Sequence, residues 1–109
     1  MADAFEDRGK GFERKYQLDE ELAFKVQSRR DKLFGLWLAE EFGLGGDEAE
    51  AYAREVVVSN FEKPGDEDMF DKVKADIQDR NMSIEDKSLR LKLQELAEVA
   101  HKQVFDDQK

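Results

Sequence analysis

The stretch FKVQSRRDKLFGLWLAEEFGL, residues 24–44, decides the fold because it is the most apolar part of the chain. Its large apolar side chains recur three or four positions apart, the spacing that places residues on one face of an α-helix. The stripe starts slightly earlier in the chain, and its members are Leu22, Val26, Leu33, Phe34, Trp37 and Leu38. We therefore predict an amphipathic helix over residues 19–42, which the glycines at 43, 45 and 46 end.

A second helix is predicted to begin at Asp47, because Glu50 stands three residues later and the two match a reciprocal N-terminal capping pair. Its buried stripe is predicted to be Ala49, Tyr52, Ala53, Val56 and either Asn60 or Phe61. Lys63, Pro64 and Gly65 then break the helix.

Two more helices are predicted after this break. Asp66, Glu67 and Asp68 place negative charge where a helix dipole favours it, at the start of a short third helix with the stripe Met69, Phe70, Val73 and Ile77. We expect this helix to be the weakest of the four. Ser83 is predicted to cap the last helix, whose apolar seam is Leu89, Leu93, Leu96, Ala97, Ala100 and Val104.

Short connections favour neighbouring antiparallel helices, so the sequence predicts an all-α fold with a compact four-helix bundle over residues 19–109. The last helix is long enough to pair antiparallel with the first. A coiled-coil dimer is less favoured, because the connections interrupt any apolar seam before four heptads are complete.

Residues 1–18 are predicted to form a separate, flexible N-terminal arm. Gly9 and Gly11 weaken a helix there, while Phe5, Phe12 and Tyr16 are the only aromatic residues. A helix formed on a partner would carry these three rings near one stripe with basic flanks, the pattern of a helix that binds in a groove. The alternative is that the rings fold back on the bundle.

Composition limits the range of functions. The 109 residues are enough for one domain, and the net charge of −9 lies entirely beyond residue 32, since residues 1–32 contain eight basic and eight acidic side chains. An acidic body repels phosphate backbones and anionic lipid, although the charge also serves solubility. We therefore expect no binding to nucleic acid and no insertion into a membrane. We expect a cytoplasmic location, because cysteine is absent and no apolar leader is visible.

No enzyme active site is visible in the sequence. The single histidine, His101, has no cysteine nucleophile or second histidine to accompany it. Asp66, Glu67 and Asp68 lack the ligand spacing of a calcium loop and fit a helix N-terminus better. We therefore expect no catalysis, no metal and no cofactor.

Two motifs carry a resemblance to a known family. The pattern F-x-x-R-x-x-x-F-E-x-K-[FY] is matched by Phe5, Arg8, Phe12, Glu13, Lys15 and Tyr16. The pattern R-R-x-K-L-x-G-L-W is matched by Arg29, Arg30, Lys32, Leu33, Gly35, Leu36 and Trp37. With these motifs the chain closely resembles the zeta inhibitor subunits of alphaproteobacterial F-type ATP synthases, a family first described as a domain of unknown function.

The resemblance implies an inhibitor of ATP hydrolysis whose arm enters a catalytic interface of the synthase head, reaches toward the rotor stalk and folds there as a helix. The bundle would stay outside as the anchor, peripheral to the inner membrane. The expected partner-binding residues are Phe5, Arg8, Phe12, Glu13, Arg14, Lys15 and Tyr16. Arg29 and Arg30 would face the docking rim, unless they are ordinary surface charges.

The sequence departs from the family pattern at several positions. Gly9 and Gly11 stand where better helix formers are expected, Gln17 and Leu18 replace Ala and His, and Asp31 stands where Asn is common. A weaker arm helix implies weaker inhibition.

Two other functions are kept as alternatives. One is a small-ligand module that binds an adenine nucleotide weakly in a gap near Trp37 and Arg29 or Arg30. The other is a factor that associates with the synthase without inhibiting it.

Overall fold

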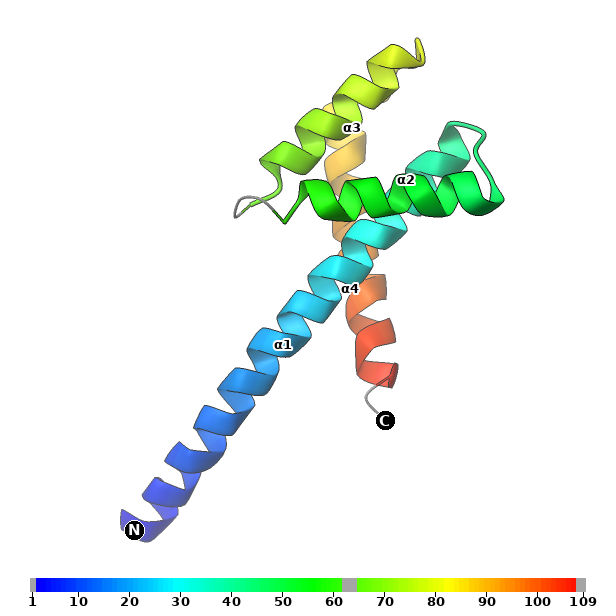
Figure 1. Cartoon of the computed structure of the whole chain (residues 1–109). Helices are drawn as coiled ribbons and strands as arrows, with labels where there is room; N and C mark the ends of the chain where they lie inside the picture. The colour runs from blue at the N-terminus through cyan, green and yellow to red at the C-terminus, as the bar shows by residue number, and fades with distance from the viewer. Residues whose placement is uncertain (1, 62–64, 108–109) are drawn as a thin grey trace.

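The computed structural model describes the backbone of residues 2–61 and 65–107, and the side chains of residues 21–61 and 65–106. Within these ranges the chain forms helices and no strand: α1, Ala2–Glu41; α2, Gly46–Ser59; α3, Glu67–Asp79; and α4, Asp86–Asp107 (Figure 1). The prediction of an all-α, four-helix fold is confirmed. The predicted break at Lys63 and Pro64 lies outside the described residues.

The first helix is longer than the sequence predicts, because α1 begins at Ala2 rather than at Asp19. Residues 2–18 contain no proline, and a helix already anchored by packed residues extends without a new nucleation step. Gly9 and Gly11 each cost about 1 kcal/mol relative to Ala, which weakens this part of α1 without ending it. The first half of α1 extends beyond the other helices, and the molecule measures 64 × 26 × 22 Å (Figure 1).

Helices α1 and α2 cross closely because a glycine of one meets an alanine of the other. A Cβ atom added to Gly35 would lie 2.7 Å from the Cα of Ala53 and 3.2 Å from the Cβ of Val56. The first separation is well below van der Waals contact, so only glycine at position 35 allows this approach. Beside the crossing, Phe34 and Leu38 are fully buried in the same core cluster as Val56.

The core joins all four helices. In Figure 1, α4 runs back along α1 in the antiparallel sense, as predicted. The ring of Phe34 in α1 lies 6.1 Å from the ring of Phe70 in α3, edge to face. Each fully buried large apolar side chain contributes about 1.5–3 kcal/mol of transfer free energy. The core cluster comprises Phe34, Leu38, Ala39, Tyr52, Val56, Met69, Phe70, Val73, Ile77, Leu89 and Leu93.

The predicted stripes match the core to different degrees. All four stripe residues of the third helix are buried, and in α4 the residues Leu89, Leu93, Ala100 and Val104 are buried. Of the stripe predicted for α1, only Phe34 and Leu38 are fully buried, whereas Leu22, Val26, Leu33 and Trp37 are partly exposed. The buried face of α1 is therefore displaced from the centre of the predicted stripe.

The ends of α1 and α3 are closed by the same backbone motif. The N–H of Leu44 donates to the carbonyl of Ala39 at 2.8 Å, and the N–H of Gly43 donates to that of Glu40 at 3.0 Å. Gly43 has φ +79°, the left-handed conformation that this Schellman motif requires and that glycine adopts without strain. At the end of α3, Asn81 takes this place with φ 55°. The predicted helix stop at Gly43 is confirmed.

Two predicted caps are wrong. The N-cap of α2 is Gly45, and Asp47 lies inside the first turn, with no side-chain hydrogen bond capping the helix. Helix α4 begins at Asp86, so Ser83 precedes it and does not cap it. The residues between α3 and α4 are instead held by Met82 and Ile84, which pack against the core. These tertiary contacts outweigh the local capping preference.

Candidate functional site

The arm residues singled out by the sequence all lie in the first half of α1. They are Phe5, Arg8, Phe12, Glu13, Arg14, Lys15 and Tyr16, and their side chains are outside the described set. The helical backbone fixes how these positions are distributed around the axis. Positions 5, 12 and 16 are seven and four residues apart, so successive members differ by only about 20–40° around a helix of 3.6 residues per turn. A helical arm therefore places the three aromatic positions on one side.

Arg30 is engaged within the molecule. Its Nε donates to Oδ1 of Asp31 at 3.0 Å, and its Nη2 lies 2.7 Å from Oδ1 of Asp66 at the start of α3. Asn60, the C-cap of α2, donates from Nδ2 to Asp31 Oδ2 at 2.9 Å and to Asp66 Oδ1 at 3.0 Å. We call these four residues the Arg30 cluster. It ties α1 to the end of α2 and the start of α3.

The Arg30 cluster also explains one feature that the sequence left open and the burial of Asp31. Of the two candidates for the end of the second stripe, Asn60 is buried and Phe61 is exposed, because the Asn60 amide serves both carboxylates. Asp31 is 1 % exposed. Burial raises the pKa of its carboxyl group, although the hydrogen bond from Asn60 and the charge of Arg30 act in the opposite direction. Burial therefore disfavours the ionised form of the Asp31 carboxyl group.

Arg29 and Trp37 lie on different parts of the surface. Arg29 donates from Nη1 to Oε1 of Gln103 in α4 at 3.0 Å. The Trp37 ring packs on Phe34 at 6.0 Å between centroids, with Nζ of Lys92 5.5 Å from its ring. Arg29 lines a groove between α1 and α2, whereas Trp37 and Arg30 do not. The structure does not bring the three predicted ligand residues together around that groove.

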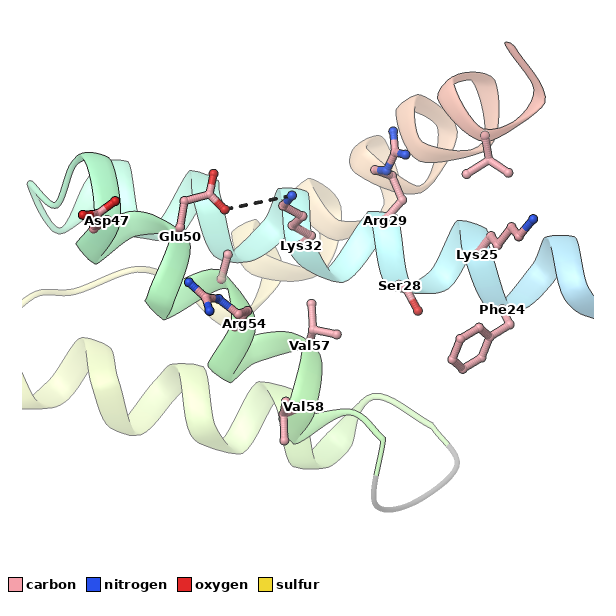
Figure 2. A pocket seen from close by; sticks show the side chains of 12 residues that line it. Phe24, Lys25, Ser28, Arg29, Lys32, Asp47, Glu50, Arg54, Val57 and Val58 are labelled. Carbon is pink, nitrogen blue, oxygen red and sulfur yellow. Dashed lines mark ion pairs between the residues drawn. The ribbon is translucent and has the colours of Figure 1, made fainter. Parts of the chain in front are cut away.

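This groove between α1 and α2 has a volume of about 720 Å³, and Figure 2 shows the side chains that line it. We call it the α1–α2 groove. Its apolar lining comes from Phe24, Ala53, Val57, Val58 and Val104, and its polar lining from Lys25, Ser28, Arg29, Lys32, Asp47, Glu50 and Arg54. Lys32 Nζ lies 4.0 Å from Glu50 Oε2, the pair joined by a dashed line in Figure 2.

At the open edge of the groove, aromatic side chains are exposed. Phe24 is 60 % exposed and stacks on Phe61, which is 52 % exposed, with ring centroids 5.7 Å apart. Sequence reasoning missed this pair. Phe24 lies away from the helical face of Leu22 and Val26, which indicates an exposed ring. Its pairing with Phe61 depends on how α1 and α2 cross.

Tyr52 and Lys72 form hydrogen bonds between α2 and α3. Tyr52 donates from its hydroxyl to Asp76 Oδ2 at 2.8 Å. Burial, followed by this hydrogen bond, raises the pKa of Tyr52 far above its usual value. For Lys72 burial acts downward, but hydrogen bonds to Asp76 and Glu55 raise its pKa overall. Both side chains therefore stay protonated at neutral pH and hold α2 against α3.

Among the side chains of residues 21–61 and 65–106, no group of three or more His, Asp or Glu is placed to hold a metal ion. None of the helices described is both long and apolar enough to cross a membrane.

Comparison with known proteins gives one family and a related fold. The family model described as ATPase inhibitor subunit zeta matches residues 1–103. A structure solved by NMR in solution is 44% identical in sequence and has a TM-score of 0.69, covering 77% of this chain and 95% of its own. No curated protein matches the chain. At this identity and coverage, the likeness extends to the fold.

Proposed function

Because this chain belongs to the ATPase inhibitor subunit zeta family, we propose that it binds the catalytic head of the F-type ATP synthase and blocks ATP hydrolysis by inserting the first half of α1 into a catalytic interface. The family is one of inhibitory, regulatory subunits rather than of catalysts. The partner would place the protein in the cytoplasm, peripheral to the inner membrane.

The observation that carries this proposal is the separation of the arm from the core. Every buried side chain among the described residues lies between Asp31 and Val104. The first half of α1 meanwhile extends beyond the other helices (Figure 1). A helical segment that extends beyond the packed helices is available to a partner (Figure 1).

In this proposal the aromatic positions of the arm are the anchors. Phe5, Phe12 and Tyr16 would be buried in the crevice of the partner, toward the rotor stalk, because large aromatic side chains supply much of the binding free energy in protein interfaces. Arg8, Arg14 and Lys15 would pair with carboxylates at its walls, and Glu13 with a basic group. Gly9 and Gly11 make the isolated arm helix weak, so it would become fully ordered only on binding.

The test is removal of residues 1–17, followed by titration of ATP hydrolysis by the purified synthase head. We expect the truncated chain to lose inhibition, while its circular dichroism and unfolding midpoint stay those of a folded body. A full-length Phe12→Ser/Tyr16→Ser variant should lose inhibition in the same assay without any change in length. Inhibition that survives both changes would place the active surface elsewhere. Binding of the wild type without any effect on hydrolysis would favour the non-inhibitory factor.

A further inference from the structure

We propose that the α1–α2 groove is a second docking site, which receives an acidic segment bearing one or two large apolar side chains from the same protein that receives the arm. This inference rests on the proposed function, because it assigns the occupant to the partner of the arm. The groove would add affinity and fix orientation, whereas the arm would carry inhibition.

The apolar part of the argument is the exposed surface at the groove. Phe24, Val58 and Phe61 are 60 %, 56 % and 52 % exposed, and the two phenylalanine rings stack on each other. Phe24 and Val58 both line the groove. Large apolar side chains gathered at a hollow are typical of interaction sites, because burying them against a partner removes about 25 cal/mol per Å² of unfavourable hydration.

The charge at the groove selects the occupant. Four basic side chains line it, Lys25, Arg29, Lys32 and Arg54, against two acidic ones, Asp47 and Glu50. The excess is positive in a chain whose net charge is −9. Lys32 and Glu50 are about half exposed and 4.0 Å apart, so they neutralise each other only weakly. A positive surface of this kind attracts and orients an acidic partner.

The position of the groove favours the partner of the arm over the arm itself. Phe24 and Lys25 lie on α1 close to where it leaves the packed helices, so a protein that holds the arm reaches the groove next (Figure 2). The arm of the same chain fits poorly, because α1 is continuous and carries it away from the groove (Figure 1). Residues 1–18 also contain as many basic as acidic side chains, which gives no charge complementarity.

The experiment compares two double variants that change the net charge equally. Lys25→Glu/Arg54→Glu reverses charge at the groove, and Lys87→Glu/Lys102→Glu reverses it at exposed positions of α4 that do not line the groove. We expect the groove variant to bind the purified synthase head on the order of tenfold more weakly at low salt, with a smaller difference at high salt. The control should stay close to the wild type. Circular dichroism and unfolding midpoints establish that both variants fold.

A cross-link identifies the occupant. The chain has no cysteine, so Val58→Cys gives a single site for a photoreactive group at the groove. Cross-linking to the synthase head, followed by mass spectrometry, should recover a segment rich in Asp and Glu. Equal affinity of the two double variants, or a cross-link to a second copy of this chain or to a segment without acidic residues, would overturn the proposal.

The two hypotheses fail in different ways. If the groove variant binds like the control while truncation of residues 1–17 still abolishes inhibition, the groove is not a docking site and the inhibitory function stands. If the groove variant binds more weakly but the wild type has no effect on ATP hydrolysis, the docking site stands and the inhibitory function fails. At saturation, the groove variant should inhibit as fully as the wild type.

Discussion

At the scale of single residues, the crossing of α1 and α2 depends on Gly35. A glycine in the middle of a helix normally costs about 1 kcal/mol relative to Ala. Here the absence of a Cβ lets the backbone of Ala53 come within 2.7 Å of the place that a Cβ would occupy. The close crossing, and with it the burial of Phe34 and Leu38, compensates for the lower helix propensity.

Gly35→Ala should therefore destabilise the fold although alanine is the better helix former. We expect the free energy of unfolding, measured by urea denaturation, to fall by about 1–3 kcal/mol because the neighbouring backbone must shift. Gly45→Ala is the control. An added Cβ there has no atom within 4 Å and φ is −146°, so the change should cost less than about 1 kcal/mol, mainly from the poorer N-cap. A Gly35→Ala variant as stable as the wild type would contradict the steric argument.

Asp31 gives a prediction about pH. Because burial raises the pKa of its carboxyl group in the folded state, the folded protein binds more protons than the unfolded chain at acidic pH. The contribution of this group to the free energy of unfolding therefore falls as the pH rises through the window between the unfolded and the folded pKa. Asp31→Asn removes this titration while keeping a polar side chain beside Arg30 and Asn60.

The stability difference between Asp31→Asn and the wild type should therefore shift in favour of the variant as the pH rises from about 3 to about 7. Urea denaturation at several pH values measures this difference. Asp71→Asn, at an exposed position of α3, controls for the general effect of removing one carboxylate. If the difference for Asp31→Asn stays constant, or changes in the opposite direction, the buried carboxylate does not titrate as we infer.

At the scale of elements, the sequence predicted the presence of the helices more accurately than their ends. All four helices were predicted from apolar spacing together with capping and helix-breaking residues, but α1 begins much earlier and α4 later than expected. The side chain of Asp66 shows why caps are hard to predict. It stands at the N-cap of α3, as its charge suggested, yet it caps no backbone N–H and bonds Arg30 and Asn60 instead. Tertiary contacts decide such positions.

The helical arm leads to a prediction about potency. Replacing both Gly9 and Gly11 by Ala should stabilise the arm helix by about 2 kcal/mol, which lowers the cost of ordering it on the partner. We expect half-maximal inhibition of ATP hydrolysis at a concentration lower by up to about thirtyfold. Gln17→Ala changes helix propensity little and serves as the control. Weaker inhibition by the double variant would mean that the partner contacts the backbone where the glycines stand.

At the scale of the whole molecule, the sequence predicted what depends on periodicity and missed what depends on packing between helices. The core of α3 was predicted completely, because Met69, Phe70, Val73 and Ile77 follow one helical face. Asp31 lies on the same helical face as Phe34 and Leu38, so the spacing alone predicts its burial. Its charge argued against that prediction. The exposed pair of Phe24 and Phe61 could not be predicted, because the contact between the two rings depends on the angle at which α1 and α2 cross.

The single continuous α1 has a consequence for how the arm is presented. Because no break separates Ala2 from the residues that cross α2, the packing around Gly35 fixes the direction around the helix axis in which each arm position points. Adding or removing one residue between arm and body would turn that direction by about 100°. Which side of the arm faces a partner surface therefore depends on the exact number of residues between arm and body. It depends less on the identity of those residues.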